Sequence, residues 1–180
     1  MAEEHPDDAR ARFEALAAEV VEPVRRFLAR RTDRDTADDV LAETLLVCWR
    51  RAEDLPDEPL PWVYGVARNC LHNAERSARR QERLAAKIAT VDPPSQVAPA
   101  PEEQDDDLLA ALAAMRPDDA ELLRLWAWEQ LTPAEIAVVL DITSNAASIR
   151  LHRAREKLKD QLRKVATASG HEESREGRRP

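Results

Sequence analysis

The chain has 180 residues and a formal net charge of −8, and these values already exclude several classes of protein. It contains only 3 Gly, 2 Phe and 1 Tyr, so strand-forming residues are scarce and an all-α fold is predicted. The acidic balance argues against a protein that coats nucleic acid through a basic surface, so any DNA binding must be local.

Catalytic and metal-binding motifs are not apparent. Cys48 and Cys70 form no Cys-x-x-Cys pair and are expected to be small buried hydrophobes. There is no Gly-rich phosphate loop and no pattern of nucleophile and base, so we expect a protein that is not an enzyme, with no catalytic residue, no metal and no cofactor. Because no apolar stretch approaches about 18 residues, a cytoplasmic protein without membrane insertion is expected.

Two helices are predicted in the first 53 residues. Apolar residues recur at helical spacing from Asp8 to Arg31, with a kink or break expected at Pro23. A second helix, capped by Asp35 or Thr36, is expected to run to about Glu53. Its predicted inward face consists of Val40, Leu41, Thr44, Leu45, Val47 and Cys48. Three acidic residues near its start, Asp38, Asp39 and Glu43, interact favourably with the helix dipole, so a capping role is the simplest explanation for them.

A proline-rich loop and a basic helix follow. The segment Asp54–Pro61 has three prolines in eight residues and is predicted to be a stiff loop. The helix that begins near Trp62 becomes strongly basic, since Gly65–Ile88 holds six basic and two acidic residues. Its polar row suits phosphate and base contacts, although a solvated helix end is an equally good interpretation. That row consists of Arg68, Asn69, His72, Asn73 and Arg76.

A change in composition divides the chain. Residues 90–107 are rich in Pro, Ala and acid without an apolar period, which is typical of a linker. We therefore predict an N-terminal helical domain at 8–88, a flexible linker at 89–106, a C-terminal domain at 107–165 and a disordered tail at 166–180. Two further helices are expected in the second domain, separated at Pro117, with Trp126 and Trp128 in its core or at its rim.

The stretch Leu131–Lys157 has the pattern of a helix-turn-helix. Thr132, Pro133 and Glu135 form a helix start with a capping box, and the pattern breaks at Asp141, where a tight turn is expected. Thr143 or Ser144 then caps a longer helix. Its predicted inward residues are Ile149, Leu151, Ala154 and Leu158, and its predicted outward cations are Arg150, Arg153, Arg155 and Lys157. A basic second helix fits insertion into the major groove, while a plain helical hairpin with a solvated face remains the alternative.

Three motifs in this order resemble those of a known family. They are DTADDVLAETLLVCWRRAEDL, PWVYGVARNCLHNAERSARR and ITSNAASIRLHRAREKL, with the proline-rich linker before the last. Together they resemble an extracytoplasmic-function (ECF) RNA polymerase sigma factor, a group IV sigma factor with only the polymerase/−10 and −35 domains. The resemblance implies an alternative sigma factor that binds core RNA polymerase and directs initiation at −10 and −35 elements.

The resemblance also implies roles for individual residues. Docking on the β′ coiled-coil of the polymerase would involve Asp38, Asp39, Glu43 and Thr44. Recognition of the −10 element would involve Asp57 and Glu58 in the proline-rich loop, followed by Arg68, Asn69, His72, Asn73 and Arg76. Recognition of the −35 element would involve Ser144, Asn145, Ala146, Ser148, Arg150 and Arg153. The β flap, promoter DNA and an anti-sigma factor would be further partners.

The chain departs from the family pattern at several positions. Asp141 stands where a Gly is usual, and Ala147-Ser148-Ile149 replaces a frequent Val-Lys-Ser run, so a promoter preference does not transfer. Two other functions explain part of the sequence: a stand-alone helix-turn-helix regulator, and a helical adaptor that does not read DNA. Neither accounts for the acidic helix, the proline-rich loop and the basic third helix together.

Overall fold

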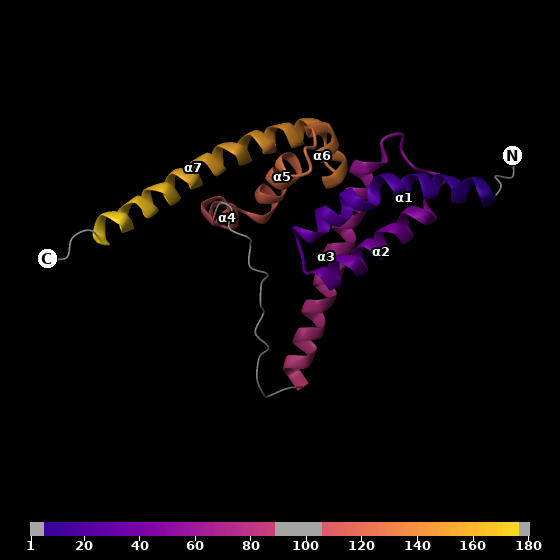
Figure 1. Ribbon diagram of the computed structural model, residues 1–180, viewed down its shortest axis with the longest axis horizontal. Helices are drawn as coiled ribbons and strands as arrows, with labels where there is room; N and C mark the ends of the chain where they lie inside the picture. The colour runs from indigo at the N-terminus through magenta and orange to yellow at the C-terminus, as the bar shows by residue number, and fades with distance from the viewer. Residues whose placement is uncertain (1–5, 89–105, 177–180) are drawn as a thin grey trace. The chain divides into compact units, whose positions relative to one another are not determined.

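The computed structural model describes residues 6–88 and 106–176, and this part of the chain is helical throughout apart from short turns (Figure 1). The helices are α1 (Pro6–Ala29), α2 (Arg34–Arg50), α3 (Pro59–Ile88), α4 (Asp106–Ala113), α5 (Pro117–Ala127), α6 (Pro133–Leu140) and α7 (Ser144–Glu176). The all-α prediction is confirmed. The chain divides into two compact units, with α1, α2 and α3 in the first and α4, α5 and α7 in the second.

The first unit is a three-helix bundle in which each helix packs on the other two. Its centre is formed by fully buried apolar side chains, among them Val20, Val24, Phe27, Leu28, Val40, Cys48, Val63 and Ala67. The rings of Phe27 and Tyr64 lie 5.1 Å apart and join α1 to α3. Burial of these side chains is the main stabilising term for the unit.

Helix α1 continues through Pro23 without the break that the sequence suggested. A proline removes one backbone donor, which leaves the carbonyl of Glu19 without its helical partner. Glu19 is exposed, so water can satisfy that carbonyl. Val20 and Val24, on either side of the proline, are both buried and hold the two halves of the helix against the core.

Helix α2 begins one residue after Asp33, which caps it. Its carboxylate accepts hydrogen bonds from the Thr36 backbone N–H at 3.0 Å and from the Thr36 hydroxyl at 2.8 Å. These bonds hold the pKa of the Asp33 carboxyl below its usual value. The predicted caps, Asp35 and Thr36, are therefore wrong. The predicted end at Glu53 is also wrong, since α2 ends at Arg50 and turns follow.

The second unit buries a smaller apolar centre, to which α4, α5 and α7 contribute Leu112, Leu122, Leu123, Leu125, Ala147, Leu151 and Ala154. Two polar contacts join α7 to α5 at the surface. The guanidinium carbon of Arg155 lies 4.7 Å from the centre of the Trp126 ring, and Lys157 Nζ lies 2.6 Å from Asp119 Oδ2. Trp126 is 39% exposed, which places it at the rim of the unit.

The segment from Thr132 to α7 is a helix-turn-helix held by local hydrogen bonds. Thr132 N–H donates to Glu135 Oε2 at 2.7 Å, and Glu135 N–H donates to Thr132 Oγ1 at 3.3 Å, which completes the predicted capping box. Asp141 has φ 52°, and Ile142 N–H donates to the Ala137 carbonyl at 3.0 Å, so α6 ends in a left-handed residue. Thr143, rather than Ser144, caps α7, because its hydroxyl accepts from Ala146 N–H at 3.2 Å.

The predicted linker and tail fall largely at the edges of the described residues. Residues 89–105 of the linker lie outside them, whereas Asp106 is the first residue of α4. The tail is predicted to be disordered from residue 166, but α7 is helical to Glu176. The continuation is consistent with its composition, since residues 166–176 contain no proline to end the helix.

Candidate functional site

The outward side of α2 combines acidic and apolar side chains. Asp38, Asp39 and Glu43 are exposed, and Leu46 is 47% exposed on the same side, seven residues after Asp39 and three after Glu43. Sequence reasoning missed Leu46, although this spacing distinguishes it from the inward residues of the helix. We call Asp38, Asp39, Glu43 and Leu46 the α2 face.

Thr44 does not belong to the α2 face, which corrects the prediction that it contacts a partner. Its side chain is fully buried, and its hydroxyl donates to the Val40 carbonyl at 2.7 Å. The helical period places it with Val40, Leu41 and Cys48, so it points into the bundle. Its predicted inward position is therefore right and its predicted role in docking is wrong.

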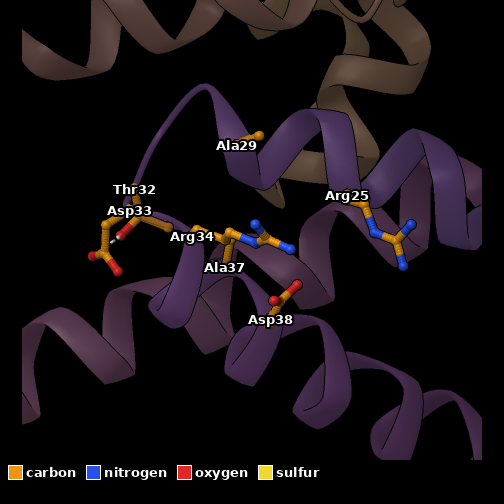
Figure 2. A pocket seen from close by; sticks show the side chains of 7 residues that line it. All are labelled: Arg25, Ala29, Thr32, Asp33, Arg34, Ala37 and Asp38. Atoms are coloured by element: carbon orange, nitrogen blue, oxygen red, sulfur yellow. Dashed lines mark hydrogen bonds between the residues drawn. The ribbon is translucent and has the colours of Figure 1, made fainter. Parts of the chain in front are cut away.

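An open hollow of about 610 Å³ lies beside the start of the α2 face (Figure 2). Arg25 and Ala29 of α1 line one side, and Arg34, Ala37 and Asp38 of α2 line the other. Figure 2 shows the side chains of Arg34 and Asp38 projecting from the same helix, with Arg25 extending from α1. The α2 face is thus bordered by two arginines that can receive acidic groups, while Asp38 can receive a basic one.

The connection between α2 and α3 has the length of the predicted loop but lies three residues earlier in the chain. Pro59 is the first residue of α3, so the non-helical connection covers residues 51–58, and Asp57 and Glu58 are exposed in it. A proline at the first helical position is favourable because no N–H is needed there. The connection borders a second open hollow of about 320 Å³, where Leu55 and Pro56 face Arg12 and Leu16 of α1.

The polar row of α3 lies along one side of the helix. At 100° per residue its five members fall within an arc of about 140°. Asn69, His72, Asn73 and Arg76 are exposed, whereas Arg68 is half-buried and its Nε makes no hydrogen bond to the described part of the chain. Exposed arginines extend the row toward the end of the helix at Arg79, Arg80 and Arg83.

The start of α7 presents polar and cationic groups to solvent. Ser144, Asn145, Ser148, Arg150 and Arg153 are exposed, and Ala146 is half-buried. Neither Arg150 nor Arg153 forms an ion pair with a described residue, in contrast to Lys157, which pairs with Asp119. Of the four cations Arg150, Arg153, Arg155 and Lys157, the first two are thus available for a partner, and the last two contact α5.

Ile149 is predicted to point inward, but its side chain is 45% exposed. The inward side of α7 is made by Ala147, Leu151 and Ala154, all buried. Ile149 lies two residues from both Ala147 and Leu151, which rotates it to the opposite side of the helix. The inward prediction for Ile149 is wrong because it is based on hydrophobic character and not on the position of the residue around the helix.

The cysteines and the ionisable residues offer no second kind of site in the described part of the chain. Burial raises the pKa of the Cys48 thiol to about 11 and also raises the pKa of Cys70, so both remain protonated and unreactive near neutral pH. Among the described residues no group of three or more His, Cys, Asp and Glu side chains is arranged to hold a metal ion. None of the described helices is both long and apolar enough to cross a membrane.

Known proteins are similar to this chain in sequence and in fold. A family model described as "Sigma-70, region 4" matches residues 105–158, which include the helix-turn-helix. The RNA polymerase sigma factor CarQ of Myxococcus xanthus is 33% identical over 163 residues, which cover 87% of this chain and 92% of CarQ. The ECF RNA polymerase sigma factor SigL of Mycobacterium tuberculosis is 29% identical over 150 residues, or 80% of this chain and 85% of SigL.

Solved structures show the same fold. The sigma factor RpoE in complex with the anti-sigma factor NepR from Bartonella quintana matches with a TM-score of 0.61 at 19% identity, over 84% of this chain and 96% of that one. CnrH in complex with the cytosolic domain of CnrY matches with a TM-score of 0.53 at 22% identity, over 83% and 86% of the two chains. By its identity to CarQ over most of both sequences, the protein belongs to the RNA polymerase sigma factors, and it is of the ECF type.

Proposed function

We propose that the protein docks on core RNA polymerase through the α2 face and recognises a promoter through two separate DNA-binding surfaces. The first surface is the α2–α3 connection with the polar row of α3, for the −10 element. The second is the start of α7, for the −35 element. In this proposal residues 8–88 and 107–165 act as separate domains joined by a linker at 89–106.

The α2 face supports the docking role because its groups have no task inside the bundle. Asp39 and Glu43 are exposed and take no part in capping, which Asp33 performs. Leu46 adds an exposed apolar side chain one turn after Glu43. A surface of this kind is complementary to a basic, partly apolar helix, such as one strand of the β′ coiled-coil, and the charges raise the rate of encounter.

The −10 role is supported by the polarity of α3 and by the hollow at its start. Arg76 and the arginines after it can contact phosphates, while Asn69, His72 and Asn73 offer donors and acceptors for base edges. The hollow beside Leu55 and Pro56 combines apolar walls with Asp57 and Arg12, a suitable lining for an unstacked base. A connection stiffened by prolines loses little entropy on binding.

The single observation that carries the proposal is a pair of exposed arginines, Arg150 and Arg153, that form no ion pair with a described residue and lie at the start of a recognition helix on a chain of net charge −8. Local cations on an acidic protein favour DNA binding only when another body positions them, which is what core polymerase would do. The β flap is the proposed contact for the second domain in that assembly.

Run-off transcription with core polymerase over a promoter library tests the proposal. Addition of the chain should stimulate initiation from a subset of templates that share −10 and −35 sequences. If the chain instead binds operator DNA with the same affinity in the presence and absence of polymerase, it is a stand-alone regulator. If the chain stimulates transcription from no template and binds no DNA, it is a helical adaptor rather than a sigma factor.

An anti-sigma factor is a further proposed partner. The support is the fold shared with RpoE, whose structure was determined with the anti-sigma factor NepR. Such a partner would act by covering the α2 face or the start of α7. Co-expression with a candidate anti-sigma factor should then abolish run-off transcription, and excess core polymerase should restore it by competition.

A further inference from the structure

Ile149 is an exposed apolar side chain in the middle of a polar helix surface. It is 45% exposed, and it is the one large hydrophobic side chain on the described part of α7 with substantial exposure. The core of the second unit is filled on that helix by Ala147, Leu151 and Ala154. Ile149 therefore contributes little to stability, and its exposed methyl groups are available to a ligand.

The neighbours of Ile149 are groups that suit a DNA duplex. Asn145 precedes it by one turn, and His152 and Arg153 follow it by one turn, so all three share its side of the helix. All are exposed, and Arg150 lies at one margin. The cations match phosphates, and the amide and imidazole match polar base edges.

The DNA-facing surface of α7 ends at Glu156. Glu156 lies two turns beyond Ile149 on the same side, where a carboxylate would repel phosphate. It is held by Lys159, whose Nζ lies 2.6 Å from Glu156 Oε1, and this contact lowers the pKa of the Glu156 carboxyl. The DNA-facing part of α7 therefore covers about three turns, from Ser144 to Arg153, with Ile149 near its centre.

We propose that Ile149 contacts the 5-methyl group of a thymine in the −35 element and is thereby a specificity-determining residue of this protein. The inference rests on the proposed function. In the major groove the thymine methyl is the one apolar group displayed at a base edge, so it is the complement of an isolated aliphatic side chain. An Ile held against any other base edge would instead cover a polar group without a hydrogen bond.

The test compares thymine with deoxyuridine, which lacks only the methyl group. A promoter obtained from the run-off library is made as a set of duplexes, each with one thymine of the −35 region replaced. Binding of the holoenzyme is measured by fluorescence anisotropy. For the wild-type chain, one replacement should weaken binding about threefold to fivefold, the effect expected for burial of one methyl group.

Variants of the chain assign that effect to the side chain. Ile149→Ala should bind the thymine and deoxyuridine duplexes equally well, whereas Ile149→Val should retain part of the difference. Val138→Ala is the matched control, because Val138 is a 54% exposed aliphatic residue on α6 rather than on the recognition helix. This control should show the full wild-type difference.

Two results would overturn the inference while leaving the sigma function intact. One is active run-off transcription with no thymine in the −35 region sensitive to removal of its methyl group. The other is a methyl sensitivity that persists unchanged in Ile149→Ala. Failure of the sigma function itself would appear earlier, as absence of stimulated transcription from every template.

Discussion

Lys157 Nζ lies 2.6 Å from Asp119 Oδ2 and links the recognition helix α7 to the first turn of α5. The two residues are 38 positions apart in the sequence. Together with the stacking of Arg155 on Trp126, this contact fixes the rotation of α7 about its own axis relative to α5. It also takes Lys157 out of the set of cations that are free to meet DNA.

Removal of the Lys157–Asp119 pair should therefore loosen α7 without reducing phosphate contacts. Because Lys157 is 53% exposed, we expect Lys157→Ala or Asp119→Ala to destabilise the second unit by only about 0.5 kcal/mol. Faster hydrogen exchange at amides of α5 and α7 would report this change. Glu156→Ala, which removes an exposed pair within α7, is the control and should leave exchange in α5 unchanged.

Charge reversal on the α2 face should abolish polymerase binding while preserving the fold. Asp39→Arg and Glu43→Arg place repulsive charges on an exposed surface, so we expect at least a tenfold decrease in affinity for core polymerase with unchanged circular dichroism. Leu46→Ala should weaken binding less. Glu14→Arg on α1, also exposed, serves as the control. Full affinity in both reversal variants would show that the α2 face is not the docking site.

Thr44→Arg should behave differently from those two variants. The Thr44 side chain is fully buried, so an arginine there must either bury its charge or displace α2 from the bundle. We expect loss of the folded first unit, visible in thermal unfolding. Thr44→Val fills nearly the same volume and should retain both fold and polymerase affinity, since the Val40 carbonyl keeps its helical partner.

Arg150 and Arg153, which form no ion pair with a described residue, predict a specific salt dependence. Removal of one phosphate contact should reduce the slope of log affinity against log salt by about 0.9. Arg150→Ala and Arg153→Ala together should thus lower the slope of holoenzyme binding to a −35 duplex by up to about 1.8. Arg155→Ala, whose guanidinium stacks on Trp126, should change it less. An unaltered slope in the double variant would argue against α7 as the −35 reader.

The Asp33 cap predicts an acid-sensitive start of α2. Hydrogen bonds from Thr36 lower the pKa of Asp33 in the folded chain, so this group stabilises the fold above its unfolded pKa of about 3.9. That stabilisation disappears as the pH falls through the lowered folded pKa. Asp33→Asn keeps a capping side chain without an ionisable group. Unfolding midpoints of wild type should therefore fall more steeply than those of Asp33→Asn as the pH falls below about 4. Equal pH profiles would contradict the assignment.

Much of the fold follows from local patterns in the sequence. Helical spacing locates all the helices of the described residues approximately, and the capping box at Thr132 and Glu135 fixes the start of α6. The errors arise where family resemblance or chemical character outweighs helical phase. Resemblance places Thr44 on a docking surface, and apolar character places Ile149 in the core. The residues three and four positions away in each helix instead show that Thr44 is buried and that Ile149 is exposed. The cap at Asp33 is not predicted because Asp33, Asp35 and Thr36 are all suitable capping residues, and only the backbone geometry distinguishes among them.

The functional surfaces are less accessible to sequence reasoning. Periodicity alone leaves the acids of α2 as dipole-favouring residues and the arginines of α3 as a solvated helix end. Their assignment comes from resemblance to a family. The division of the α7 cations depends on Trp126 and Asp119, residues outside the helix, so no inspection of the recognition helix by itself reveals it.

Asp141 gives the helix-turn-helix a property that a glycine would not. A non-glycine residue at φ 52° carries strain of roughly 1 kcal/mol, but it also restricts the unfolded chain more than glycine does. The turn consequently has fewer conformations to lose when the helix-turn-helix folds. This smaller loss of entropy offsets part of the backbone strain at Asp141 in the stability of the folded turn.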